Sequence, residues 1–395
     1  MDATSAGYSA AQALRGGGRD ALAEAMVRIR QQTLALAQAW MAAEPGVPCH
    51  PWLNLPLWEW GHLAWFQEYW VGRNRQRDLG TACDPDHLRL PSRLPEADAW
   101  YDSSRVAHAT RWTLALPGAP ETLGYLRETM EQTMSLLAAL PADANHEALY
   151  FFRLCALHEA MHAEAAAYMG RHLGLRMPVP EVPMPPPAQV EPLRVPAQSF
   201  CLGSTGPGFA FDNELGAHEL VLAAFEIDAE PVSWDRFQRF VDDGGYAHRG
   251  WWSDEGWSWR DQARPRPPDA PDAAGPHPAA HLSAFEAQAW CRWAGRRLPT
   301  EAEWECAAIT QPGFRWGRVW EWTASPFQPY PGFAAHPYRD YSAPWFDSRL
   351  VLRGAAAATS RWLAHPRYRN FFEPQRTDVF AGFRSCASGG VVPGV

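Results

Sequence analysis

The chain of 395 residues carries 35 Lys and Arg against 44 Asp and Glu, and 47% of its residues are hydrophobic. This length exceeds one ordinary hydrophobic core and predicts two domains, while the acidic balance, without a cluster of Lys and Arg, argues against a nucleic-acid partner. No run approaches about 18 consecutive apolar residues, so the sequence predicts no transmembrane helix and no membrane partner.

In the first part of the chain, apolar residues recur at the spacing of an α-helix and predict four helices. The last one has a clear end at Leu173-Gly174-Leu175, where a glycine and the prolines from Pro178 onward stop a helix. Four helices with one long connection, residues 79–120, predict a bundle, and bundles build metal sites from side chains of facing helices. The predicted helices span residues 20–43, 56–77, 121–140 and 144–175.

Eight prolines lie between Pro178 and Pro196 and predict a stiff linker. Beyond it the chain is rich in glycine and tryptophan, which is typical of a compact, loop-rich core or of the wall of a ligand pocket. Two further helices are predicted there, at residues 233–244 and 281–294. We therefore expect a helical domain at residues 1–180, the linker at 181–195 and a second domain at 196–395.

The motif that carries chemistry is His158-Glu159-Ala160-Met161-His162, inside the fourth predicted helix. Histidines four residues apart lie on one face of a helix and can bind one divalent metal ion. His62, in the second predicted helix, lies in an almost entirely apolar stripe, so its ring needs a partner: either the same metal or a carboxylate or backbone carbonyl in the core. Three imidazoles suit iron, copper, zinc or nickel, so these residues alone do not select the metal.

A zinc hydrolase is the alternative that the same motif suggests, with Glu159 as general base beside a zinc-bound water. Its third ligand would have to come from downstream, and His172 is the only nearby candidate. The spacing does not match the usual continuations of the motif, and a bundle offers no edge strand to hold a peptide. Otherwise we expect Glu159 to support a ligand histidine or to lie on the surface.

The second part of the chain resembles the formylglycine-generating-enzyme/sulfatase-modifying domain, a variant of the C-type-lectin fold. The resemblance covers most of residues 195–387, but a counterpart of the copper-binding cysteine pair of the formylglycine enzyme is not evident. That activity is therefore not implied. The motifs that carry the resemblance include Gly244-Gly245-Tyr246, Gly295-Arg296-Arg297-Leu298-Pro299-Thr300-Glu301-Ala302-Glu303-Trp304-Glu305, Trp320-Glu321-Trp322-Thr323 and Ala381-Gly382-Phe383-Arg384.

Residues 15–175 resemble the DinB-like helical domain, and the two domains together resemble the ergothioneine-type sulfoxide synthases. The resemblance implies an α+β protein in which a DinB-like four-helix bundle precedes a C-type-lectin-like domain. It also implies a non-heme iron enzyme that uses O2 to join sulfur to the imidazole C2 of hercynine (trimethylhistidine). By motif position, the Fe(II) ligands would be His62, His158 and His162.

Two departures from that family's pattern concern the donor atom. The second motif here is Leu157-His158-Glu159-Ala160-Met161-His162 instead of His-His-Glu-Gln-x-His, and Phe372 stands where one branch has an aspartate for the donor's amino group. Residues 56–70 and 378–384 are most similar to the selenoneine synthase branch, which takes selenium from a selenosugar. The resemblance therefore implies a selenosugar donor, with cysteine or γ-glutamylcysteine as the alternative.

The family resemblance also implies roles near the C-terminus. Asn370 and Arg376 correspond to substrate-binding positions, and Phe371 and Phe372 are expected against the quaternary ammonium of hercynine, because aromatic faces bind such cations. One of two tyrosines, Tyr338 or Tyr341, would be the proton donor near the iron.

Arg105 and Arg111 could reach the site from the bundle, although a solvated helix face is the simpler expectation for both. Seven scattered cysteines without a C-x-x-C favour reduced thiols and a cytoplasmic protein, and Met1–Ser5 lacks the form of a signal peptide. A binding protein whose lectin-like domain holds a ligand without turnover remains a third class besides the two enzymes.

Overall fold

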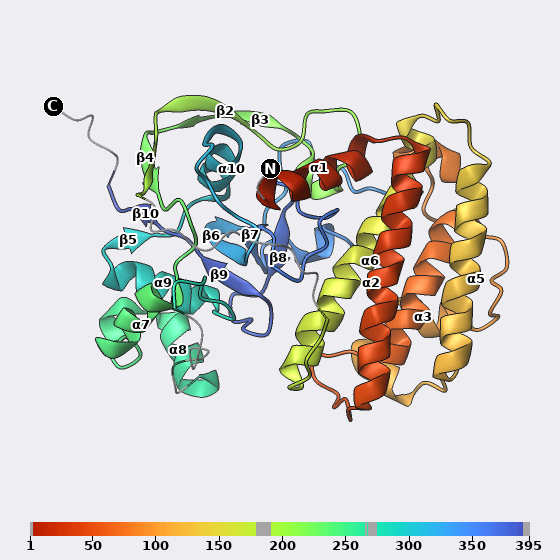
Figure 1. Ribbon diagram of the computed structural model, residues 1–395, viewed down its shortest axis with the longest axis horizontal. Helices are drawn as coiled ribbons and strands as arrows, with labels where there is room; N and C mark the ends of the chain where they lie inside the picture. The colour runs from red at the N-terminus through yellow and green to blue at the C-terminus, as the bar shows by residue number, and fades with distance from the viewer. Residues whose placement is uncertain (1–2, 179–190, 265–266, 268–274, 390–395) are drawn as a thin grey trace.

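The computed structural model describes residues 3–178, 191–264, 267 and 275–389. Most of the predicted linker, residues 181–190, lies outside this range. Helices pack side by side in one part of the molecule, and short strands with smaller helices form the other (Figure 1). The helices of the first part are α1 (Ala3–Gly16), α2 (Arg19–Ala43), α3 (Pro56–Gln67), α4 (Ala97–Tyr101), α5 (Ala119–Ala138) and α6 (His146–His172).

Helix α6 belongs to the helical part of the molecule and contacts the second part. The Asn145 side chain caps its first turn by accepting a hydrogen bond from the Ala148 N–H at 2.9 Å. Its last turn closes with two 2.9 Å hydrogen bonds, from the Leu175 N–H to the Gly170 carbonyl and from the Gly174 N–H to the Arg171 carbonyl. Gly174 has a φ of +76°, which favours glycine, and the predicted end of this helix is thereby confirmed.

Helix α3 is shorter than the prediction of residues 56–77. It continues as a π-helical turn, Glu68–Gly72, in which the Arg73 N–H donates to the Glu68 carbonyl at 2.7 Å. The buried Glu68 carboxylate accepts hydrogen bonds of 2.6 Å from Tyr125 on α5 and from Ser92. These contacts hold the end of α3 against α5 and turn the chain away, which the apolar pattern alone does not reveal.

The described residues of the second part form three sheets, with strand orders β1-β4-β10-β5, β2-β3 and β8-β7-β6-β9. In the third sheet β6 pairs with β7 antiparallel, Trp320 opposite Gly354, and with β9 parallel. The strands are β1 (Leu193–Val195), β2 (Gln198–Leu202), β3 (His218–Leu222), β4 (Phe225–Ile227), β5 (Arg296–Arg297), β6 (Trp320–Pro326), β7 (Leu350–Gly354), β8 (Asn370–Phe372), β9 (Ala381–Phe383) and β10 (Cys386–Ala387). The helices are α7 (Trp234–Asp242), α8 (Asp254–Ala263), α9 (Ala284–Trp293) and α10 (Glu301–Thr310).

Buried charges hold the start of strand β8 against α10 and β7. Arg369, the residue before β8, is fully buried and donates to both carboxylate oxygens of Glu301 at 2.9 and 3.0 Å. Arg353 on β7 reaches the same carboxylate at 3.1 Å. Removing one partner of such a buried pair leaves an uncompensated charge and costs about 3–5 kcal/mol, so the start of β8 is held firmly. In the described part of the chain, no helix is both long and apolar enough to cross a bilayer.

Candidate metal centre

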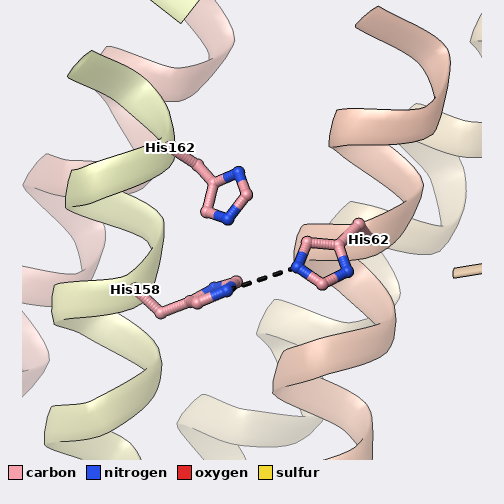
Figure 2. A group of neighbouring side chains, drawn as sticks. All are labelled: His62, His158 and His162. Atoms are coloured by element: carbon pink, nitrogen blue, oxygen red, sulfur yellow. Dashed lines mark hydrogen bonds between the residues drawn. The ribbon is translucent and has the colours of Figure 1, made fainter. Parts of the chain in front are cut away.

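Three histidines converge between α3 and α6 (Figure 2). His62 comes from α3, and His158 and His162 come from successive turns of α6. One ring nitrogen of each lies within 4.8 Å of the other two, and the Nε2 atoms of His62 and His158 are 3.3 Å apart. Two nitrogens that each lie about 2.1 Å from one metal ion at a right angle are about 3 Å apart, so this spacing suits a shared ion.

A hydrogen bond at Nδ1 orients the ring of His62. Its Nδ1 lies 2.8 Å from the backbone carbonyl of Tyr101, so Nδ1 carries the proton and Nε2 is left with a free lone pair. The Trp58 ring stacks on the imidazole at 4.8 Å between centroids. Burial lowers the pKa of His62 to about 3, and repulsion from His162 adds to the effect. The ring is therefore a neutral ligand at physiological pH.

His162 is oriented by a carboxylate from the facing helix. Its Nδ1 lies 2.5 Å from Oε2 of Glu59, which precedes His62 by less than one turn of α3. The Asn54 side chain donates to the other Glu59 oxygen at 2.6 Å, and Arg111 donates to Asn54 at 3.0 Å. Burial alone would raise the pKa of Glu59, but the charge and hydrogen bond of His162 hold it at about 2. Glu59 thus stays ionised and turns Nε2 of His162 toward the centre.

His158 is positioned by packing instead of by a hydrogen bond to Nδ1. Its ring stacks on Phe66 at 3.6 Å with an interplanar angle of 5°, and Nδ1 is buried with no hydrogen-bond partner among the described residues. Burial holds the pKa of His158 well below its ordinary value, and the two neighbouring histidines lower it further. The imidazoles of His62 and His158 can therefore each offer a nitrogen lone pair to a cation.

A cavity of about 240 Å³ opens beside His162. One wall is the stripe of α6 that faces the second part of the molecule, and the opposite wall comes from β6, β8 and the segment around Tyr341. Among the described residues, the lining has no Lys or Arg, and aromatic rings dominate it. The lining residues are Met161, His162, Glu164, Ala165, Tyr168, Trp320, Tyr341, Leu363, Tyr368, Asn370, Phe371, Phe372 and Val379.

Comparison with known proteins gives a family. The hercynine oxygenase of Mycolicibacterium smegmatis is 30% identical over 93% of this chain and 98% of its own length. The chain belongs to the hercynine oxygenase family. The enzyme of that name from Mycobacterium tuberculosis is 30% identical over 91% of this chain and 96% of its own length.

The second part of the chain also matches another group of proteins. The family model of the sulfatase-modifying factor enzyme 1-like domain matches residues 181–316. The formylglycine-generating enzyme of Bos taurus is 32% identical over 33% of this chain and 43% of its own length. Together with the full-length relatives, these matches place the chain in the superfamily of ergothioneine-type sulfoxide synthases. The expected α+β fold and the expectation of an oxidative enzyme are confirmed.

Glu159 does not face the histidine centre. It is buried and accepts two hydrogen bonds from Arg30 on α2, at 2.6 and 2.9 Å. Arg30 also donates to Gln67 at 2.7 Å, so the pair joins three helices of the bundle. The expectation that Glu159 supports a ligand histidine is wrong, because the residue after His158 points about 100° away from it around the helix. The expectation that Glu159 lies on the surface is also wrong, because it is buried against Arg30. The carboxylate that supports a ligand is Glu59.

The predicted substrate residues fall into two groups. Asn370, Phe371 and Phe372 line the cavity beside His162. Arg376 does not, and it is engaged by Asp378 through two contacts of 2.6 Å. Its role in substrate binding stays a prediction that the geometry does not favour.

The two predicted tyrosines line different cavities, although their ring centroids are only 6.1 Å apart. Tyr341 lines the cavity, and its hydroxyl lies 3.1 Å from that of Tyr368, a residue that the sequence analysis missed. Tyr338 packs edge-on against Phe66 and His158, with centroid distances of 4.9 and 6.0 Å. It lines a second cavity of about 240 Å³, which also includes Asp102 and Arg105.

The two bundle arginines also differ. Arg111 does not lie on a solvated helix face, in contrast to the expectation. Its guanidinium lies 3.7 Å from the Trp58 ring centroid, and Trp58 in turn stacks on His62. Arg105 is exposed as expected and pairs with Asp102 at 3.2 Å. His172, the third ligand of the hydrolase hypothesis, packs beside His50 and Trp52 at the end of α6, outside the histidine group.

Glu164 is a functional candidate that the sequence analysis did not find. It is 6% exposed and lines the cavity two residues after His162. Burial raises its pKa to about 7, against two hydrogen bonds that lower it. The signal was the spacing of Met161, Glu164, Ala165 and Tyr168 on one helical stripe, because a carboxylate in such a buried stripe needs a reason.

Proposed function

We propose that the chain is an Fe(II)- and O2-dependent enzyme that joins selenium from a selenosugar to the imidazole C2 of hercynine. The observation that carries the proposal is the convergence of the nitrogens of His62, His158 and His162 beside an aromatic cavity, in a chain related to hercynine oxygenases along nearly its whole length. The proposed alternative is a C–S bond with cysteine or γ-glutamylcysteine as donor.

The three histidines would hold the metal through Nε2. Tyr101 and Glu59 engage the Nδ1 atoms of His62 and His162, which leaves their inner nitrogens free, as metal-bound imidazoles require. Three protein nitrogens leave open positions for small molecules on a metal of higher coordination number. Bound iron would supply the redox chemistry with O2, and the protein would position the substrates and exclude water.

The cavity fits the aromatic and cationic character of hercynine. Trp320, Phe371 and Phe372 present ring faces or edges beside His162, and Asn370 adds an amide in the same wall. Holding the imidazole of the substrate next to the histidine centre converts a rare encounter into an oriented, nearly unimolecular step. Tyr341, with its hydroxyl paired to Tyr368, and Tyr338, against His158, are the two candidates for proton delivery.

The surroundings of Phe372 support a donor without amino-acid groups. At that position the cavity has an aromatic ring and not a carboxylate that could hold a donor's amino group. Arg376 is neutralised by Asp378, so it is not available for a donor's carboxylate. Both features suit a selenosugar better than cysteine. We also propose a cytoplasmic enzyme, because all seven cysteines are free.

The test offers Fe(II)-loaded enzyme hercynine and O2 with a selenosugar, cysteine and γ-glutamylcysteine in competition. We expect mass spectrometry to find a product with the selenium isotope pattern attached to hercynine. A product that contains only sulfur would establish the alternative donor. Metal analysis that finds tightly held zinc, with no coupling product and no oxygen uptake, would instead favour the hydrolase, and oxygen uptake excludes a pure binding protein.

A further inference from the structure

The second cavity, of about 240 Å³, lies where the helical part of the molecule meets the second part. Phe66 and Tyr338 belong to its lining, and both rings also pack on the ring of His158, at centroid distances of 3.6 and 6.0 Å. The cavity therefore ends one ring away from a member of the histidine group. A molecule bound in it would lie close to the centre without entering the cavity beside His162.

Aromatic rings form the apolar side of the second cavity. Trp65, Tyr69 and Trp70 line it, and the Tyr69 ring centroid lies 5.1 Å from each of the other two. The Trp65 indole N–H donates to Asp98 at 2.7 Å, which fixes that ring. Tyr69 is half-buried. Such a surface can cover the apolar face of a ligand.

Carboxylates and hydroxyls form the polar side. Among the described residues, the lining has three aspartates and two arginines. Both arginines already have a partner there, because Arg339 contacts Asp86 at 3.0 Å and Arg105 contacts Asp102 at 3.2 Å. For the carboxylate of Asp340, no hydrogen-bond donor is found in the described parts of the chain. Burial and the charge of Asp102 raise the pKa of Asp340, so the two carboxylates act on one another.

This combination favours a neutral ligand with several hydroxyl groups. A hydroxyl that donates to a carboxylate makes a short, strong hydrogen bond, and Asp340 has both oxygens available for one. The carboxylate of an amino-acid donor would need a cation, but the two arginines are engaged and the aspartates outnumber them. A sugar ring has both required surfaces, hydroxyl groups at its edge and C–H groups on its faces.

We propose that the second cavity binds the sugar ring of the chalcogen donor, with its hydroxyl groups on Asp340 and a C–H face on Tyr69, so that the chalcogen atom points past Tyr338 toward the histidine centre. This inference rests on the proposed function for the identity of the donor. It assigns the two substrates to separate cavities and makes Asp340 a specificity-determining residue for a sugar over an amino acid.

The test is the binding of 1-thio-β-D-glucose, the sulfur counterpart of a selenosugar, to Fe(II)-loaded enzyme. Calorimetry under nitrogen and without hercynine excludes turnover. In Asp340→Asn we expect the thiosugar to bind about 10-fold more weakly, because an amide replaces a charged acceptor. Ethanethiol, which has the sulfur but no hydroxyl group, should bind equally well to both proteins. In turnover, the KM for the selenosugar should rise and the KM for hercynine should not.

The matched control is Asp347→Asn, the same change a few residues further along, outside both cavities, where Gln328 donates to the carboxylate. It should bind the thiosugar as the wild type does. Unchanged iron content and melting temperature show that Asp340→Asn is folded; if it is not, Tyr69→Leu decides, because it removes the aromatic face. Asn370→Ala, in the cavity beside His162, should leave thiosugar binding unchanged.

Equal affinities of wild type and Asp340→Asn for the thiosugar would overturn the inference, and so would a wild type that does not bind it. If the wild type still joins selenium to hercynine, the proposed function stands in both cases. A wild type that couples only cysteine or γ-glutamylcysteine would contradict the proposed donor. Thiosugar binding that depends on Asp340 would even then support the assignment of the second cavity.

Discussion

His62→Ala is expected to lose its stoichiometric iron and all measurable coupling activity while remaining folded. His62 is the one member of the histidine group that comes from α3, and without it the two imidazoles of a single helix would have to hold the ion alone. The substitution also leaves a small gap against Trp58, which stacks on the ring. Iron content by elemental analysis, oxygen uptake and a melting curve measure the three consequences.

His172→Ala is the matched control, because His172 lies on α6 but is exposed and outside the histidine group. It should retain iron and activity. The two variants also separate the leading hypothesis from the zinc hydrolase, in which His172 would be the third ligand. Metal retained in His62→Ala and lost in His172→Ala would refute our assignment.

Glu59→Gln is expected to weaken metal binding by about 10- to 100-fold, the usual effect of removing a carboxylate that supports a ligand histidine. The amide can still contact Nδ1 of His162, but it cannot supply the charge that polarises the ring. Competition with a metal chelator measures the affinity. Asn54→Ala, which removes only the second contact of Glu59, should have a smaller effect. An equal affinity in Glu59→Gln and the wild type would show that Glu59 serves packing alone.

In the metal-free protein, the effect of Glu59→Gln on stability is expected to depend on pH. Burial raises the pKa of Glu59, but His162, with His62 and Arg111, outweighs this effect and lowers the pKa to about 2. A lowered pKa stabilises the folded state above the ordinary value of 4.5, and this contribution is lost as the pH falls through 4.5 toward 2. The difference in melting temperature between wild type and Glu59→Gln should therefore shrink as the pH falls from about 5 toward 2.

The sequence predicts those features of the fold that depend on local signals. The end of α6 follows from Gly174 and the prolines beyond it, and the histidine pair of α6 follows from spacing of four residues. The turn after α3 was missed, because it depends on contacts between Glu68, Ser92 and Tyr125, which are far apart in the chain. Helix α1 was also missed, since its short apolar pattern is weak.

The candidate site shows the same division. His62 could be found from its apolar surroundings, and Asn370 and Phe371 from motif position, because each carries its signal in its own segment. Glu59 and Glu164 could not be assigned, since their partners His162 and Trp320 lie on other elements. In both cases, however, a carboxylate within a buried stripe of a helix indicated that the residue needs a polar partner.

The most direct test of the histidine centre is diffraction at the iron absorption edge, from crystals of Fe(II)-loaded enzyme grown without oxygen. We expect one anomalous peak per chain, bonded to the Nε2 atoms of His62, His158 and His162. A peak at any other position, or one that leaves His62 bonded only to the Tyr101 carbonyl, would contradict the account.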